Sequence, residues 1–352
     1  MSKKTIAIIG PTASGKSDAA IAIARAHGGA VIGADSRQVY RHMDLGSGKE
    51  PGTTIDLTQG VSLYHSRTGG NSGPSTKYPL ATLHTLSQTE LLTHPYISAG
   101  VPHYMIDVAD PTEDYSAGRF AREARAVMDA LHAHAILPIV CGGTHFWVQA
   151  LLENTPFAAV PPDDTLRRKL AALSCDELLS RLEACDARRA ADIVRKNEQH
   201  NRHRLIRAIE ICTALGYVPS AQSMPPDPHT TLIVAIIPPM AQIEHNIIAR
   251  LQPRLDAGML EEVRTLHDTH RVSYERLEHF GLEYKWCALL LQEKCTLQEM
   301  RNGIIRESRQ FAKRQITWIR RWQKNGARIH TVTTPHAAHH VADTFLAAHK
   351  DV

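Results

Sequence analysis

The 352-residue sequence predicts an α/β protein: a P-loop-type open parallel sheet with flanking helices and a helical insertion domain. Short apolar runs bounded by Gly, Pro or Asp are typical of buried parallel strands, and helical patterns separate most of them. A glycine-rich loop joins the first apolar run to the first helical pattern, and one later stretch carries helical patterns alone. A sheet of this kind binds its ligand beyond the carboxyl ends of its strands.

The elements follow one another in the order that such a sheet requires. Helical patterns cover Lys16–Ala26 and Ser116–His134, and Ser116 is a suitable N-cap for the second of them. Because the strands alternate with these helices, we expect right-handed crossovers between parallel strands. The predicted strands are Thr5–Ile9, Ala30–Gly33, His103–Val108, Leu137–Val140 and Leu232–Ile237.

Two segments interrupt this alternation. Residues 51–100 are rich in Gly, Ser, Thr and Pro, which predicts a long surface insertion to which we assign no function. Residues 163–228 offer no strand and predict a helical insertion domain between the first part of the core, residues 1–162, and residues 229–352, which complete the core and add basic C-terminal helices. Its predicted helices are Asp163–Leu173, Cys175–Cys185, Asp186–Arg195 and Arg202–Leu215.

The composition narrows the class of protein. With 43% hydrophobic residues the chain can bury a core, and its net charge of +4 is too small to indicate a polyanionic partner by itself. We expect a cytoplasmic protein without a membrane partner, because no apolar run approaches the ~20 residues that span a bilayer. The cysteines are widely spaced and predict reduced thiols, with neither a zinc site nor a disulfide: Cys141, Cys175, Cys185, Cys212, Cys287 and Cys295.

The most specific motif is a phosphate-binding loop after the first strand. It fits G-x-x-x-x-G-K-[ST] and comprises Gly10, Pro11, Thr12, Ala13, Ser14, Gly15, Lys16 and Ser17. Backbone N–H groups and the helix N-terminus face a phosphate there, Lys16 adds a positive charge, and the Ser17 hydroxyl is a ligand for Mg²⁺. The flanking strand and helix argue against a chance glycine-rich turn. The motif leaves open which diphosphate is bound.

Two further strand ends carry polar groups toward the same crevice. Asp35 follows the second strand, where it is placed either to accept a proton from a nucleophile or to cap a short helix. Gly142, Gly143 and Thr144 follow a later strand and leave a hydroxyl over the crevice, although a simple strand-to-helix turn would look the same. At each strand end, the sequence leaves both the functional and the purely structural interpretation open.

The C-terminal stretch from Arg301 to Arg328 is strongly basic and interleaved with aromatic residues. Cations suit phosphates and flat rings suit bases, so this stretch fits a nucleic-acid surface. The spacing of Phe311, Trp318 and Trp322 fits an amphipathic helix equally well, so we expect the rings mostly in the core and the arginines mostly on the surface. A second basic group consists of Arg202, His203, Arg204 and Arg207.

These motifs together resemble the tRNA dimethylallyltransferases, which transfer the dimethylallyl group from dimethylallyl diphosphate to N6 of the adenosine 3′ of the anticodon and release diphosphate. D-S-x-x-x-Y and A-K-R-Q-x-T-W are much more specific to that family than the phosphate loop. The matching segments are Gly10–Ser17, Asp35–Tyr40, Met43–Gly46, Pro102–Asp107, Asp110–Ser116, Gly142–Thr144, Arg204–Glu210 and Ala312–Trp318.

The resemblance implies roles for individual residues. Asp35 is the general base, Thr144 helps to position the diphosphate leaving group, Arg250 contacts the diphosphate, and Ser17 of the phosphate loop holds Mg²⁺. A monomer that binds tRNA and dimethylallyl diphosphate is expected. A segment near Glu278–Glu283 also maps to RNA, and the expected tRNA-binding residues are Asp35, Ser36, Arg37, Gln38, Thr144, Arg167, His203, Arg204, Leu205, Ile206, Arg207, Lys313 and Arg314.

The chain departs from the family pattern at three places. Trp147 replaces the usual tyrosine after G-G-T-x-x, and residues 51–100 are longer than usual. The usual G-Y-[KR]-[EQ] becomes Gly281-Leu282-Glu283-Tyr284, which loses the tyrosine and a basic residue from their usual positions.

Three other functions share part of this sequence pattern. A small-molecule or nucleotide kinase would use the first two motifs but not the basic aromatic stretch. An isopentenyltransferase for free adenine nucleotides would keep the diphosphate site and need little RNA surface. An RNA-binding protein with an inactive phosphate site is disfavoured, because Lys16, Ser17, Asp35 and Thr144 are all present.

Overall fold

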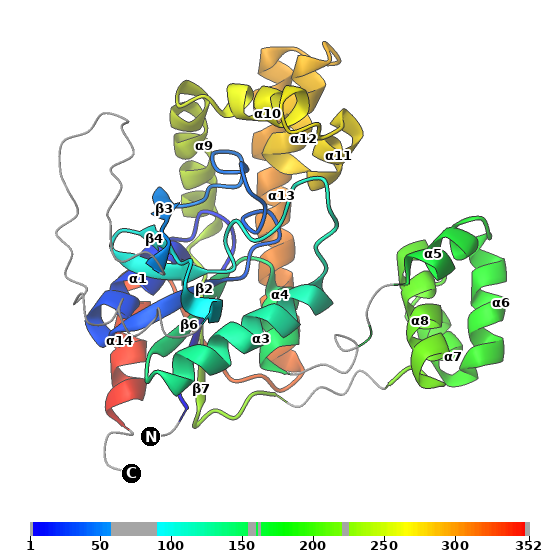
Figure 1. The fold of residues 1–352 in the computed structure, drawn as a ribbon, viewed down its shortest axis with the longest axis horizontal. Coiled ribbons are helices and arrows are strands. Elements are labelled where there is room, and N and C mark those ends of the chain that lie inside the picture. The colour runs from blue at the N-terminus through cyan, green and yellow to red at the C-terminus, as the bar shows by residue number, and fades with distance from the viewer. Residues whose placement is uncertain (1–2, 58–89, 154–159, 161–162, 220–224, 349–352) are drawn as a thin grey trace. The chain divides into compact units, whose positions relative to one another are not determined.

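The structure is a computed structural model that describes residues 3–57, 90–153, 160, 163–219 and 225–348 (Figure 1). The chain divides into two compact units. The first holds residues 1–115, 123–148 and 225–352, and the second holds residues 116–122 and 149–224. The sequence-predicted domain boundaries at residues 163 and 228 stay a prediction.

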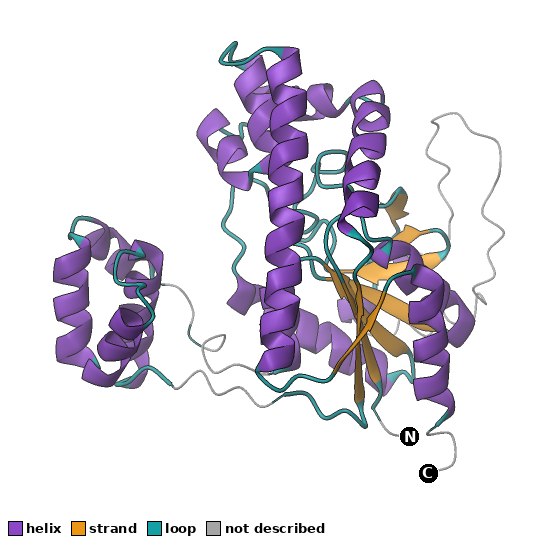
Figure 2. Ribbon diagram, turned by 180° about the vertical axis from the view of Figure 1, so that it is seen from behind, coloured by secondary structure: helices purple, strands orange, loops and turns teal. Residues whose placement is uncertain are grey.

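The first unit is built on a mostly parallel sheet, whose strands are orange in Figure 2. Its eight strands lie in the order β3-β4-β5-β2-β6-β1-β7-β8. Buried β1 lies between β6 and β7, with Ile8 opposite Cys141 on one side and Val234 on the other. The strands are β1 Thr5–Ile9, β2 Gly29–Gly33, β3 Gly52–Thr54, β4 Tyr96–Ser98, β5 Val101–Tyr104, β6 Leu137–Gly142, β7 Thr231–Ile236 and β8 Ile329–Val332.

The predicted strands are confirmed to within about two residues, with one exception. The third was predicted at His103–Val108, but β5 ends at Tyr104. Met105 and Asp107 have φ angles of 64° and 57°, in the left-handed region, so an extended strand cannot continue through them. The apolar character of Met105 and Ile106 gives no sign of this bend.

Helices cover the sheet of the first unit (Figures 1 and 2). Apolar residues of α1 and α14 pack with those of β1 and β7 in one core, and α9 packs against the long α13. The predicted cap of α3 is confirmed, because Arg119 N–H donates to Ser116 Oγ at 3.2 Å. Outside the four-helix insertion the helices are α1 Lys16–His27, α3 Ala117–Ala133, α4 His145–Leu152, α9 Met240–Asp256, α10 Met259–Asp268, α11 Tyr274–Phe280, α12 Leu282–Leu291, α13 Leu297–Lys324 and α14 Pro335–Ala347.

The second unit contains the four helices that the sequence predicted. They are α5 Asp164–Ala171, α6 Cys175–Cys185, α7 Ala187–Arg195 and α8 Arg202–Leu215. Polar side chains cap all four N-termini, namely Asp163, Ser174, Asp186 and Asn201. Leu178, Leu182, Ile193, Leu205 and Ile209 form the centre of an apolar core. The unit therefore has its own core and its own helix signals.

One prediction about the cysteines is wrong. Cys185 and Cys212 form a disulfide, with their Cα atoms 6.4 Å apart across a sequence separation of 27 residues. The packing of α6 against α8 brings the two residues together, and cysteine spacing cannot reveal a contact of that kind. The remaining cysteines, Cys141, Cys175, Cys287 and Cys295, are free thiols.

The predicted surface insertion begins and ends as part of the sheet. β3 pairs antiparallel with β4, which pairs antiparallel with β5, so both ends of the insertion extend the sheet edge. A short 3-10 helix, η2, covers Glu90–Leu92, while residues 58–89 lie outside the described part. Within the described ranges, no helix is both long and apolar enough to cross a membrane.

Candidate active site at the carboxyl ends of the strands

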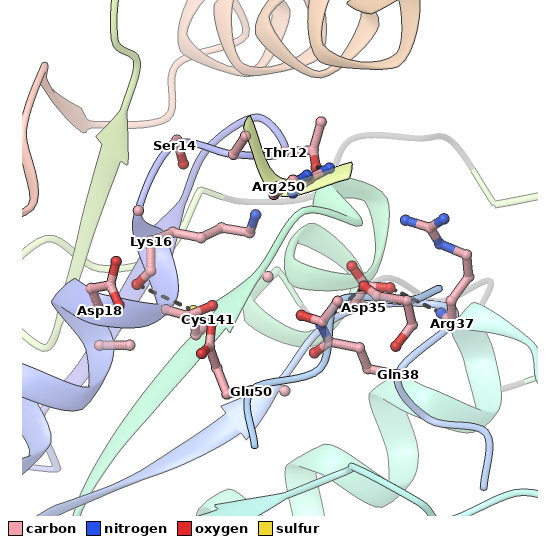
Figure 3. A pocket seen from close by; sticks show the side chains of 18 of the residues that line it. Thr12, Ser14, Lys16, Asp18, Asp35, Arg37, Gln38, Glu50, Cys141 and Arg250 are labelled. Carbon is pink, nitrogen blue, oxygen red and sulfur yellow. Dashed lines mark hydrogen bonds between the residues drawn. The ribbon is translucent and has the colours of Figure 1, made fainter. Parts of the chain in front are cut away.

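A pocket of about 530 Å³ opens at the carboxyl ends of the central strands (Figure 3). The phosphate loop and the start of α1 form one wall, and residues after β2 form another. Arg250 and Arg254 enter from α9, and Phe311 and Gln315 from α13. The structure thus brings together the loop, Asp35 and Arg250, which the sequence singled out separately.

The phosphate loop wraps as the motif requires. Ala13 and Gly15 have φ angles of 62° and 80°, and α1 begins directly afterwards at Lys16. A side chain at Gly10 would bring its Cβ within 2.5 Å of the Ile236 carbonyl oxygen, so only glycine fits. Lys16 Nζ donates to the Pro11 carbonyl at 3.3 Å and points across the loop. Desolvation lowers the pKa of Lys16, and Arg250 and Arg37 lower it further, although Cys141 and Asp35 act in the opposite direction.

Gln315 fixes this loop relative to a second strand end. Its Oε1 accepts from Thr12 N–H at 2.8 Å, and its Nε2 donates to the Gly143 carbonyl at 2.8 Å. The side chain is buried, so both bonds are shielded from water. Gln315 is the glutamine of the A-K-R-Q-x-T-W motif, and the motif alone indicates no role for it. Its role is visible only once α13 is placed beside the loop.

Asp35 makes a local backbone hydrogen bond and also lines the pocket. Its Oδ1 accepts from Arg37 N–H at 3.0 Å, which is the bond of a local turn, while the residue also lines the pocket. Thr144 stands beside it, because Ser36 N–H donates to Thr144 Oγ1 at 3.0 Å and Thr144 N–H donates to the Ala34 carbonyl at 3.2 Å. The two strand ends are therefore joined by direct hydrogen bonds.

Arg250 reaches the phosphate loop from α9. Its Nη2 donates to Thr12 Oγ1 at 2.7 Å. Burial and the neighbouring Arg254 lower the pKa of Arg250 to about 10, at which the guanidinium is still charged at neutral pH. This wall of the pocket is consequently cationic.

Glu283 lies buried beside the arginines of the pocket wall. It falls in the segment expected to face RNA, but it is only 3% exposed. Its Oε2 accepts from Arg37 Nη1 at 2.9 Å and its Oε1 from Arg254 Nη1 at 3.4 Å, while Arg250 Nη2 lies 3.9 Å from Oε1. Burial would raise the pKa of Glu283, but the three arginines outweigh it and hold the pKa below its ordinary value. These partners are remote in sequence, so no local pattern signals them.

Tyr284 also points inward. Its hydroxyl accepts from Ser47 N–H at 3.0 Å and donates to Glu262 Oε1 at 2.9 Å. A Cβ at Gly46 would come within 2.6 Å of the tyrosine ring, which explains the glycine in that motif. The altered Gly281–Tyr284 segment thus supports the pocket from inside.

Oxygen ligands suitable for a divalent cation gather at the start of α1. Ser17, Asp18 and Glu50 all line the pocket, and the Glu50 carboxylate bonds the Ser17 hydroxyl. Burial and the nearby Asp18 raise the pKa of Glu50. Hydroxyl and carboxylate oxygens are the donors that Mg²⁺ prefers, so these residues fit that ion.

The basic stretch of α13 divides between surface and core. Lys313 and Arg314 are exposed, as are most of its other cations. Trp322 is buried, which confirms the core prediction for that ring, while Phe311 and Trp318 are half-buried and Phe311 lines the pocket. The prediction for the rings is therefore only partly right.

Gln38 lines the pocket, and six other sequence-predicted residues lie in the second unit. His203 and Arg204 are exposed, and Arg204 pairs with Glu198. Arg167 and Arg207 both bind the buried Glu210, with Nε to Oε1 at 2.6 Å and Nη1 to Oε2 at 3.1 Å respectively. Two expected RNA contacts are apolar and lie against the core, where Leu205 is fully buried and Ile206 half-buried.

The fold and the pocket define a P-loop α/β protein with a cationic pocket between a phosphate loop and half-buried arginines. Comparison with known families then identifies it: an "IPP transferase" model matches residues 93–322, and an "Isopentenyl transferase" model matches residues 3–68. The chain belongs to the IPP transferase family. The resemblance predicted from the sequence is confirmed.

Individual relatives are similar in sequence to this protein over nearly the whole chain. "tRNA dimethylallyltransferase 2" of Trichlorobacter lovleyi is 33% identical over 327 residues, 92% of this chain and 90% of that protein. Its namesake from Syntrophotalea carbinolica is 32% identical over 337 residues, 94% of each chain.

Among solved structures, the tRNA isopentenylpyrophosphate transferase of Bacillus halodurans has a TM-score of 0.60 at 24% identity and covers 98% of this chain and 96% of that one. A eukaryotic dimethylallyltransferase acting on tRNA has a TM-score of 0.72 at 22% identity, with 99% and 80% covered. These two structures support the fold.

Proposed function

We propose that the protein transfers the dimethylallyl group of dimethylallyl diphosphate to N6 of the adenosine 3′ of the anticodon in tRNA and releases diphosphate. The observation that carries this proposal is the junction of three features in one pocket: a phosphate loop, Arg250 bonded to that loop, and Asp35 at the neighbouring strand end. Relatives named tRNA dimethylallyltransferase, similar over most of the chain, identify the acceptor.

The loop and its cations stabilise the leaving group. As the allylic C–O bond breaks, the diphosphate oxygen gains negative charge, and cations stabilise that charge more in the transition state than in the ground state. Lys16 and Arg250 face the place where the diphosphate would lie. Thr144 holds the Asp35 strand end beside them through the Ser36 N–H.

Asp35 handles the proton. The exocyclic amine of adenine is a weak nucleophile because its lone pair is delocalised into the ring. A new C–N bond forms while the C–O bond breaks, the diphosphate leaves with the bonding electrons, and one amine proton passes to the Asp35 carboxylate. Its local bond to Arg37 N–H occupies one carboxylate oxygen and holds the side chain at the pocket edge.

Magnesium belongs to this proposal. Ser17 would hold the ion, with Asp18 and Glu50 beside it. When bound, Mg²⁺ neutralises part of the charge of the diphosphate.

The acceptor base must leave its stack in the anticodon loop to reach such a pocket, at a cost of a few kcal/mol. Contacts to the rest of the RNA offset that cost. The exposed candidates in the first unit are Lys313 and Arg314, and in the second His203 and Arg204.

We further propose that the protein acts as a cytoplasmic monomer.

Incubation with radiolabelled dimethylallyl diphosphate tests the proposal. tRNA, AMP and ADP are offered separately as acceptors, with and without Mg²⁺, and the label is expected in tRNA alone. Label in AMP or ADP would indicate a transferase for free nucleotides, and ATP-dependent phosphorylation of a small molecule would indicate a kinase. Either result contradicts the proposal.

A further inference from the structure

We infer that Glu283 is an internal counter-anion of the pocket, and that it limits how tightly the pocket holds a diphosphate. The inference rests on the proposed function, because it takes the pocket ligand to be a diphosphate. It concerns a buried acid that the proposed mechanism does not use.

Three arginines connect Glu283 to the pocket. Arg37, Arg250 and Arg254 all line the cavity, and all approach the Glu283 carboxylate within 2.9–3.9 Å. Glu283 itself is only 3% exposed and is not a lining residue. A single carboxylate therefore contacts these cations from the protein side while a ligand would contact them from the cavity.

The carboxylate is ionised at neutral pH. Burial would raise the pKa of Glu283, but Arg37, Arg250 and Arg254 more than compensate. Arg250 and Arg254 repel each other, and this repulsion helps to lower the pKa of Arg250. In the empty pocket Glu283 thus offsets part of the repulsion among the guanidinium groups.

The same charge opposes an incoming diphosphate. Charges a few ångströms apart inside a protein interact by several kcal/mol, so a fixed negative charge behind the arginines reduces the attraction that they exert on an anion. The expected consequence is weaker binding of both donor and product, and faster release of the product diphosphate.

A purely structural role for Glu283 makes the opposite prediction. If the carboxylate only held the arginines in place, its removal would let them move and would weaken anion binding. If it acts as a counter-anion, its neutralisation strengthens anion binding. The sign of the change in affinity separates the two roles.

Calorimetric titration of the full chain with inorganic diphosphate measures this sign without tRNA or turnover. Glu283→Gln keeps an oxygen acceptor for Arg37, and we expect it to bind diphosphate about tenfold more tightly than the wild type, a change of about 1.4 kcal/mol. The matched control is Glu275→Gln on α11, an exposed site with the same change of charge, which should stay within about twofold. Unchanged or weaker binding by Glu283→Gln overturns the inference.

A second pair of variants covers the case in which Glu283→Gln does not fold. Arg254→Gln alone should weaken diphosphate binding about tenfold. The double variant Glu283→Gln with Arg254→Gln removes one charge of each sign and should return to within about threefold of the wild type. A double variant that binds no more tightly than Arg254→Gln contradicts the inference. A wild type that does not bind diphosphate contradicts the proposed function as well, whereas normal wild-type binding confines any failure to Glu283.

Discussion

Buried glutamates with arginine partners occur in both units, and their surroundings differ. Glu283 in the first unit binds arginines that line a cavity. Glu210 in the second unit binds Arg167 and Arg207, and Arg207 also donates to the Val160 carbonyl at 2.6 Å. The same residue types therefore line a cavity in one place and join the helices of a compact unit in the other. What decides between them is whether the arginines also face a cavity.

The largest expected effect concerns Asp35 in the pocket of the first unit. Asp35→Ala should lower turnover by about 10²–10⁴-fold, because the variant removes the group that accepts the amine proton. Its tRNA affinity and melting temperature should remain close to those of the wild type. Single-turnover transfer rates and thermal melts check both expectations. A stability loss of about 1 kcal/mol with an unchanged rate would show that Asp35 acts only as a local cap.

The largest effect on stability is expected around Glu210. Replacing Arg167 and Arg207 together by Met should lower the free energy of unfolding by about 3 kcal/mol, because the buried carboxylate loses both of its charged partners. Adding Glu210→Gln to that variant should recover much of the loss. The exposed pair Arg168 and Arg204, replaced in the same way, is the control and should cost at most about 1 kcal/mol. Equal losses in the two pairs, measured by denaturant unfolding, would remove the distinction between them.

The loss of stability at acid pH gives a second test of the role of Glu210. Burial raises the pKa of the Glu210 carboxyl, but hydrogen bonds from Arg167, Asp163 N–H and Arg207 more than offset it, so its pKa in the folded protein is low. A carboxyl of that kind stabilises the fold above its unfolded pKa of about 4.3, and the contribution disappears as the pH falls through the folded pKa. Wild type should therefore lose more stability than Glu210→Gln between neutral and acid pH. Parallel urea titrations measure the difference, and identical losses would contradict it.

The smallest expected effect concerns Arg204, an exposed arginine of the second unit. Arg204 is exposed and lies three residues before Arg207, which binds Glu210. If Arg204 contacts a phosphate of a single-stranded loop, Arg204→Gln should flatten the salt dependence of tRNA binding by roughly 0.7 in log–log slope. Donor KM and stability should not change. An unaltered slope would make Arg204 an ordinary surface residue.

Much of the fold could be predicted because its signals are local. The strand Thr5–Ile9 follows from an apolar run, and the helix predicted at Lys16–Ala26 follows from a phosphate-loop motif and a helical pattern. The four helices of the second unit follow from their helical patterns. The early end of β5 was missed, because the left-handed backbone at Met105 and Asp107 leaves no mark in the residue types.

The candidate site was predicted only as far as its motifs reach. The loop, Asp35 and Arg250 could be named in advance, but Glu283 and Gln315 act through partners far away in the sequence. The disulfide between Cys185 and Cys212 was missed for the same reason, because it depends on how α6 packs against α8. Local patterns identify groups that touch a ligand more readily than groups that hold those groups in place.

The bond from Thr12 N–H to Gln315 Oε1 links residues 303 positions apart in the chain. During synthesis the phosphate loop leaves the ribosome long before the helix that supplies the amide. A nascent chain that already contains every residue of the loop would therefore still lack the contact that fixes it to Gly143. The pocket gains its final shape only after that helix has emerged, so a nascent chain without the helix is not expected to hold a diphosphate as the complete pocket does.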